Sequence, residues 1–99
     1  MAKRVAHPKR IDGNQRACVD AMRAAGSLVL ITASVGMGVP DCFATNRAGR
    51  WIAIEIKQPG EGLTEAEAII HARSAEHDCP ICVVYTIDEA IAQVTGDLE

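Results

Sequence analysis

The sequence predicts an α/β fold with a mixed sheet flanked by helices, mainly because of the pattern of its apolar residues. β-rich apolar runs, which are typical of strands, occur at residues 27–32, 41–45, 50–57 and 80–86. Segments with helical spacing or helix caps surround them, at residues 12–25, 64–76 and 88–94. The resulting order, α-β-β-β-α-β-α, indicates an antiparallel hairpin followed by a crossover helix.

The first half of the chain should form one helix and two strands around a glycine-rich loop. Asp12 can cap a helix that Gly26 ends, and the run 27–32 follows as the first strand. Residues 33–40 contain two glycines and a proline, which predicts a loop. We expect the second strand to begin at Asp41, directly after that loop.

The second half should begin with a central strand and continue through two more helices. Residues 46–49 (NRAG) predict a hairpin connection, and residues 50–57 (RWIAIEIK) are mostly apolar on both faces, as in a central strand. Thr64 can cap the next helix, and Glu67 can complete a capping box. The strand at 80–86 and a short helix then close the domain.

The composition indicates one domain, residues 12–99, preceded by a basic arm at residues 1–11. The 99 residues suffice for one core, and the hydrophobic content of 48% disfavours a disordered chain. No apolar run approaches the roughly 20 residues that cross a bilayer, and the N-terminus lacks the apolar stretch of a secretory signal. We therefore expect a cytoplasmic protein with reduced cysteines and no membrane partner.

The net charge of −3 hides a strong asymmetry between the two halves of the chain. Residues 1–50 contain eight basic and three acidic residues, whereas residues 51–99 contain two basic and ten acidic residues. A basic N-terminal half can meet nucleic-acid phosphates. It is equally well explained as a solubilising tail on an acidic domain.

Three charged residues on neighbouring strands predict a catalytic site. Side chains alternate along a strand, so Glu55 and Lys57 should share one face, and Asp41 opens the neighbouring strand of the hairpin. Two carboxylates there, with the backbone carbonyl of Ile56 as a third donor, suit Mg²⁺ or Mn²⁺. Such an ion can promote phosphodiester hydrolysis, while Lys57 favours hydroxide or stabilises developing negative charge. The alternative is a structural cluster of ion pairs.

The same residues resemble a known nuclease superfamily. Gly36-x-Gly38-Val39-Pro40-Asp41, followed by Glu55-Ile56-Lys57, is similar to the PD-(D/E)XK pattern, most closely the virus-type replication-repair nuclease (VRR-NUC) family in its small stand-alone phage and bacterial form. The resemblance extends to Asp12-x-Asn14-Gln15, Leu63-Thr64, Val83-Val84 and Asp88-Glu89-Ala90. It implies a restriction-endonuclease-like core and metal-dependent cleavage of branched DNA. It also implies a homodimer that acts on four-way (Holliday) junctions in DNA repair.

The resemblance also implies roles for individual residues. Asp41 and Glu55 would be metal ligands, Lys57 the catalytic lysine and Gln15 the assisting residue on the first helix, with Asp12 and Asn14 as further candidates for that role. The family often has Gln where this chain has Glu67, which we expect to act as a capping-box residue. Contacts to backbone phosphates, which favour DNA shape over sequence, are expected from Lys9, Arg10, Ser34, Gly36 and Gly38.

Two other classes of protein compete with the endonuclease. One is a nucleic-acid-binding module that keeps the nuclease fold without catalysis, and the other is a thiol-redox or zinc protein built on Cys79 and Cys82. We expect His71 and His77 to be solvated or structural, and Trp51 to pack under the first helix.

Overall fold

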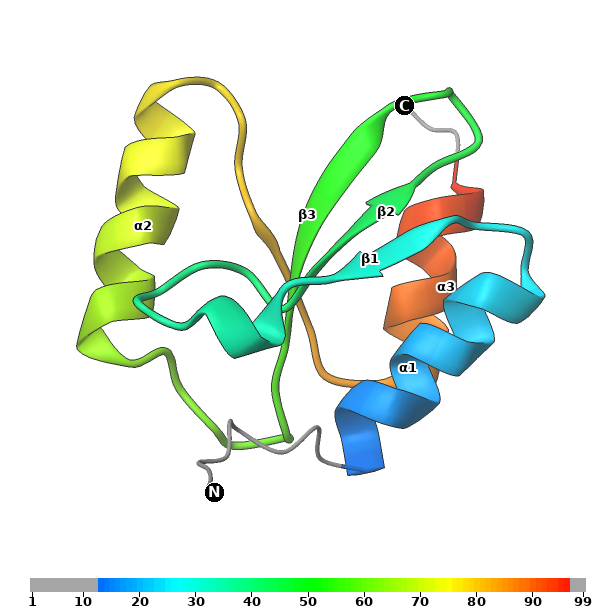
Figure 1. Ribbon diagram of the computed structural model, residues 1–99, viewed down its shortest axis with the longest axis horizontal. Helices are drawn as coiled ribbons and strands as arrows, with labels where there is room; N and C mark the ends of the chain where they lie inside the picture. The colour runs from blue at the N-terminus through cyan, green and yellow to red at the C-terminus, as the bar shows by residue number, and fades with distance from the viewer. Residues whose placement is uncertain (1–12, 97–99) are drawn as a thin grey trace, which may run out of the picture.

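The computed structural model describes residues 13–96, in which two helices cover one face of a four-stranded sheet and a third helix stands apart (Figure 1). In chain order the elements are α1 (Gly13–Ala24), β1 (Val29–Ile31), the 3₁₀ turn η2 (Ala33–Val35), β2 (Cys42–Thr45), β3 (Trp51–Ile56), α2 (Glu65–Glu76), β4 (Cys82–Val84) and α3 (Ile87–Thr95). The predicted order of helices and strands is therefore confirmed. The predicted arm at 1–11 and the Asp12 cap lie outside the described residues.

The sheet is mixed, with the strands in the order β1-β2-β3-β4. β1 and β2 pair antiparallel, β2 and β3 form the predicted hairpin, and β3 pairs parallel to β4. A parallel pair needs a crossover connection, which α2 supplies. The central position predicted for β3 is confirmed. It brings the first residue of β2 and the last residue of β4 beside the end of β3, where Glu55 and Ile56 lie.

The hydrophobic core lies between the sheet and the pair α1 and α3, which pack against each other. Strand alternation directs Ile54 and Ile56 of β3 to this side. The buried core residues are Cys18, Val19, Met22, Val29, Cys42, Ala44, Ile54, Ile56, Val84, Ala90 and Val94. The core is thus mostly aliphatic, and it fixes β3 firmly from one side.

The ends of several elements differ from the sequence-based bounds because side chains compete with backbone pairing. The Ser27 hydroxyl donates to Thr45 O at 2.7 Å, so β1 begins only at Val29. Thr86, predicted to end the last strand, instead accepts a hydrogen bond from Glu89 N and caps α3. The capping box predicted for α2 is confirmed.

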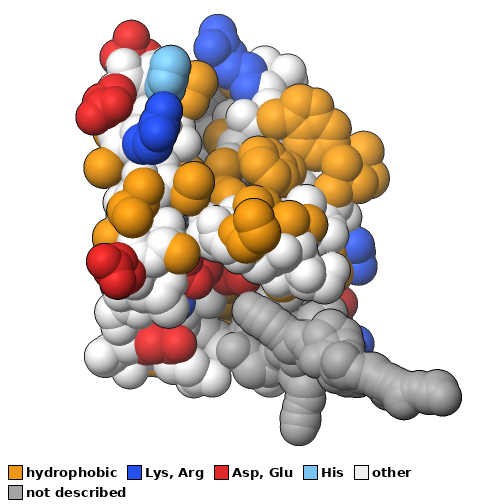
Figure 2. Space-filling view, turned by 60° about the vertical axis from the view of Figure 1, so that its left-hand side comes forward, with side chains coloured by type: hydrophobic (Ala, Val, Ile, Leu, Met, Phe, Trp, Pro, Cys, Tyr) orange, Lys and Arg blue, Asp and Glu red, His pale blue; other side chains and the backbone are white. Residues whose placement is uncertain are grey.

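The other face of the sheet carries a partly exposed apolar surface. The prediction that Trp51 packs under the first helix is wrong, because Trp51 is 51% exposed and shares the face of Glu55, opposite the core. By register the same face carries Leu30, Phe43 and Ala53. Figure 2 shows apolar side chains gathered on this side of the molecule.

Helix α2 contains no buried residue, and it meets the rest of the domain near its first turns. There, Gly38 packs so closely against α2 that a Cβ atom would lie 2.8 Å from the carbonyl carbon of Ala66. Among the described residues, no helix is long and apolar enough to cross a membrane.

Candidate active site

Asp41 and Glu55 meet beneath the surface at the open end of the β2–β3 hairpin, opposite its turn. The backbone N–H of Ile56 donates to Asp41 Oδ2 at 2.7 Å, which fixes the aspartate beside β3. Glu55 is only 1% exposed and shares a hydrogen bond with Asp41. The structure thus brings together the two carboxylates that the sequence placed on neighbouring strands.

Burial and the neighbouring acids together hold a proton on Glu55. Loss of water contact, the hydrogen bond with Asp41 and the nearby negative charges raise the pKa of Glu55 to about 9, although Lys57 acts in the opposite direction. Two adjacent carboxylates that share a proton are poised to exchange it for a cation. Metal binding here should therefore release a proton at neutral pH.

Lys57 lies one strand position beyond Ile56 and is also buried. Its Nζ is 2.7 Å from Glu67 Oε1 on α2 and 3.9 Å from Glu61 Oε2. Burial alone would lower the pKa of Lys57, but the hydrogen bond and charge of Glu67 outweigh it, so the pKa is raised. The lysine is therefore a cation at neutral pH. Glu67 holds it in addition to accepting the Thr64 N–H in the capping box.

His71 is a residue of the site that the sequence analysis missed. Its Nε2 lies 3.8 Å from Glu55 Oε1, and burial lowers the pKa of the imidazole. Because His71 follows Glu67 by four residues, the two side chains leave α2 on the same face. This spacing was the available signal, and it becomes informative once Glu67 is known to meet Lys57.

The N-terminus of α1 is tied to the same end of the sheet. Asn14 Nδ2 donates to Lys57 O at 2.8 Å and to Tyr85 O at 3.2 Å, joining α1 to the chain just beyond β3 and β4. Gln15, predicted to assist the metal, is buried on α1 next to this anchor. Its catalytic role stays a prediction.

The residues predicted to contact DNA fall into two groups. Lys9 and Arg10 lie outside the described residues. Ser34 is exposed on η2, Gly36 is partly exposed, and Gly38 is buried against α2. Ser34 and Gly36 are thus accessible to a phosphate, whereas the structure gives Gly38 a packing role.

The donor set fits a hard divalent cation that keeps part of its water shell. Glu55 Oε1 is buried and, within residues 13–96, has no hydrogen-bond partner. In the same part of the chain, no three His, Cys, Asp or Glu side chains form a ready-made metal cage. An ion held by Asp41, Glu55 and the Ile56 carbonyl would complete its shell with water, as Mg²⁺ commonly does.

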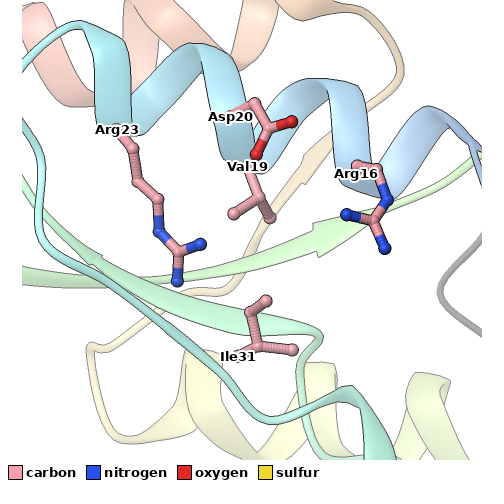
Figure 3. Close-up of a pocket in the computed structure, with 5 residues that line it drawn as sticks. All are labelled: Arg16, Val19, Asp20, Arg23 and Ile31. Carbon is pink, nitrogen blue, oxygen red and sulfur yellow. The ribbon is translucent and has the colours of Figure 1, made fainter.

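Other polar features lie away from this site. Cys82 donates to Gln93 Oε1 at 3.2 Å, and burial raises the pKa of its thiol, which opposes the thiolate that redox or zinc chemistry needs. Figure 3 shows a separate hollow between α1 and β1. It is lined by Arg16, Val19, Asp20, Arg23 and Ile31.

Known proteins resemble this chain in structure but not detectably in sequence. No protein-family model matches the sequence, and no curated protein matches it significantly. A solved structure described as a "VRR_NUC domain" superposes with a TM-score of 0.64 and 20% identity, over 77% of this chain and 84% of that one. The chain has the fold of a VRR_NUC domain. In this VRR_NUC fold, the acidic pair and Lys57 lie where β2 and β3 meet α2.

Proposed function

We propose that the protein is a divalent-metal-dependent DNA endonuclease that hydrolyses phosphodiester bonds. The observation that carries this proposal is the buried Glu55 carboxyl beside Asp41, with one oxygen unpartnered and Lys57 nearby. Ionisable groups in the interior of a sheet are costly unless they have a partner or a purpose. The VRR_NUC fold supports the same conclusion.

In the proposed reaction, Asp41, Glu55 and the Ile56 carbonyl hold Mg²⁺ or Mn²⁺. When bound, the ion neutralises the scissile phosphate and activates a water molecule. The raised pKa of Lys57 favours one of its two predicted roles, because a protonated lysine stabilises negative charge on the phosphate and cannot accept a proton from water. An incoming phosphate would compete with Glu67 for this ammonium group.

We further propose that the substrate is branched DNA, with four-way junctions favoured. Lys9, Arg10, Ser34 and Gly36 would contact backbone phosphates, and such contacts position DNA without reading its sequence. Gln15 would assist at the metal from α1. The function fits the repair or replication of branched DNA in a bacterium or a phage-infected cell.

A homodimer would place two such sites on two strands of a junction. The apolar face of the sheet, on which Leu30 and Trp51 are each about half exposed, is not covered by α1 or α3. An exposed apolar patch on a small domain marks an interaction surface, and a symmetric dimer is the commonest way to cover one.

The dimer is tested by replacing Trp51. Trp51→Glu should convert a dimer into a monomer, because a charge cannot be buried unpaired at the interface, whereas Trp51→Phe should keep the dimer. Sedimentation velocity measures both. As the only tryptophan, Trp51 should also shift its emission to shorter wavelength as the wild type dimerises. A wild-type monomer at all concentrations contradicts the proposal.

The nuclease is tested with labelled four-way junction, flap, single-stranded and linear duplex DNA, in Mg²⁺, Mn²⁺ or EDTA. Cleavage should require metal and fall by about 10²–10³-fold in Asp41→Asn and in Lys57→Ala. Glu76→Gln, which changes an exposed carboxylate at the far end of α2, should cleave like the wild type.

The alternative to a nuclease is a binding module that keeps the nuclease fold. Binding of junctions in EDTA, with no cleavage of any substrate in either metal, would identify the protein as such a module. In that case its DNA affinity should still fall steeply with salt.

A further inference from the structure

Two buried polar atoms face each other between α2 and β3 without a hydrogen bond. His71 Nε2 and Glu55 Oε1 are 3.8 Å apart, which is too far for a hydrogen bond. Within residues 13–96, neither atom has any hydrogen-bond partner. Because buried polar atoms are nearly always satisfied, this pair calls for a bridging group, such as a water molecule or an ion, that bonds to both atoms.

The surroundings of this gap favour a cation. Asp41 and Glu55 bring two carboxyl groups, while the positive charge of nearby Lys57 is paired with Glu67. A metal ion bonds to a nitrogen or oxygen donor at about 2.1 Å. The 3.8 Å separation is shorter than two such bonds, so one ion can touch both atoms.

We propose that His71 Nε2 joins Glu55 Oε1 in holding the ion, so that α2 supplies a nitrogen ligand and biases the site towards a transition metal such as Mn²⁺ over Mg²⁺. The proposal rests on the metal site of the proposed function and adds one residue to it. Transition-metal ions accept imidazole readily, whereas Mg²⁺ binds almost entirely to oxygen.

The geometry of α2 explains how one helix serves the site twice. Glu67 and His71 are four residues apart, so both side chains point from α2 towards β3. Glu67 reaches Lys57, and His71 reaches Glu55 two residues earlier on the strand. A helix with no buried residue of its own is therefore placed to contribute to the metal site and to hold the lysine.

The test measures how Mn²⁺ binds to the full-length protein in the absence of DNA. Electron paramagnetic resonance of free Mn²⁺ gives the affinity, and pulsed measurements detect the coupling of bound Mn²⁺ to an imidazole nitrogen. We expect this coupling in the wild type and in His77→Ala, and its loss in His71→Ala and His71→Gln. Mn²⁺ affinity should fall at least about tenfold in both His71 variants, since even outer-shell partners are worth that much. Competition with Mg²⁺ should show a smaller fall for Mg²⁺.

Two results would overturn the proposal: wild-type protein that binds Mn²⁺ without nitrogen coupling, or His71 variants that keep both the coupling and the affinity. Circular dichroism shows whether each variant is folded, and the wild-type measurement decides even if both variants are not. Failure here is distinct from failure of the nuclease. DNA cleavage without nitrogen coupling refutes only the role of His71, whereas coupling without cleavage refutes only the nuclease.

Discussion

Glu55→Gln is expected to abolish cleavage and, at the same time, to stabilise the metal-free protein at alkaline pH. Cleavage should fall by at least about 10²-fold, because the amide cannot replace an anionic metal ligand. Stability should rise because the amide needs no proton to remain buried beside Asp41. Few substitutions are expected to move activity and stability so far in opposite directions.

The direction of the pH effect depends on whether the folded or the unfolded protein keeps the Glu55 proton to higher pH. Its pKa is about 9 in the folded protein and about 4.5 in the unfolded chain, so the folded state binds more protons between these values. The stability from this group is complete below pH 4.5 and is lost progressively as the pH rises to about 9. Glu55→Gln should therefore melt clearly above the wild type at pH 8. The difference should be smallest at pH 5.

Thermal unfolding from pH 5 to pH 9 in EDTA measures this effect. Glu76→Gln is the matched control, since it removes an exposed glutamate from the protein and should leave the pH dependence unchanged. Mn²⁺ should stabilise the wild type and not Glu55→Gln, which would reduce or reverse their order. Parallel pH curves for the wild type and Glu55→Gln would show that Glu55 is not the buried proton carrier.

The features that could be predicted from the sequence are those with a local cause. The apolar character of residues 50–57 placed β3 in the centre of the sheet, and Thr64 with Glu67 located the start of α2. The hairpin then determined that Asp41 would meet the strand of Glu55, because a short turn leaves little choice of register.

The features that could not be predicted depend on contacts between distant segments. Alternation put Trp51 on the face of Glu55, but it could not show that α1 and α3 would both cover the opposite face. His71 becomes part of the site only through the placement of α2 over β3. That placement depends on Gly38, which is 28 residues from Ala66 in the chain and in contact with it in the fold.

Gly38→Ala is expected to disable the site without altering any residue that touches the metal or DNA phosphate in the proposed reaction. Gly38 has a φ of +86°, and a Cβ there would overlap the carbonyl oxygen of Ala66 and lie 2.9 Å from Ile70 Cγ1. Relief requires α2 to move, which separates Glu67 from Lys57 and His71 from Glu55. We expect about 2–4 kcal/mol of lost stability from strain and displaced backbone. Cleavage should fall by roughly 10²-fold, since a shift of about 1 Å can cost that much.

Gly49→Ala is the control that distinguishes the effect of the clash with α2 from the effect of backbone strain alone. Gly49 has a similar φ of +79°, but a Cβ there would meet no atom within 4 Å, and it lies in the β2–β3 turn away from the site. It should lose stability through strain and keep its cleavage rate per folded molecule. Hydrogen exchange should be faster along α2 in Gly38→Ala and unchanged there in Gly49→Ala. Equal losses of cleavage in the two variants would mean that the position of α2 does not govern the site.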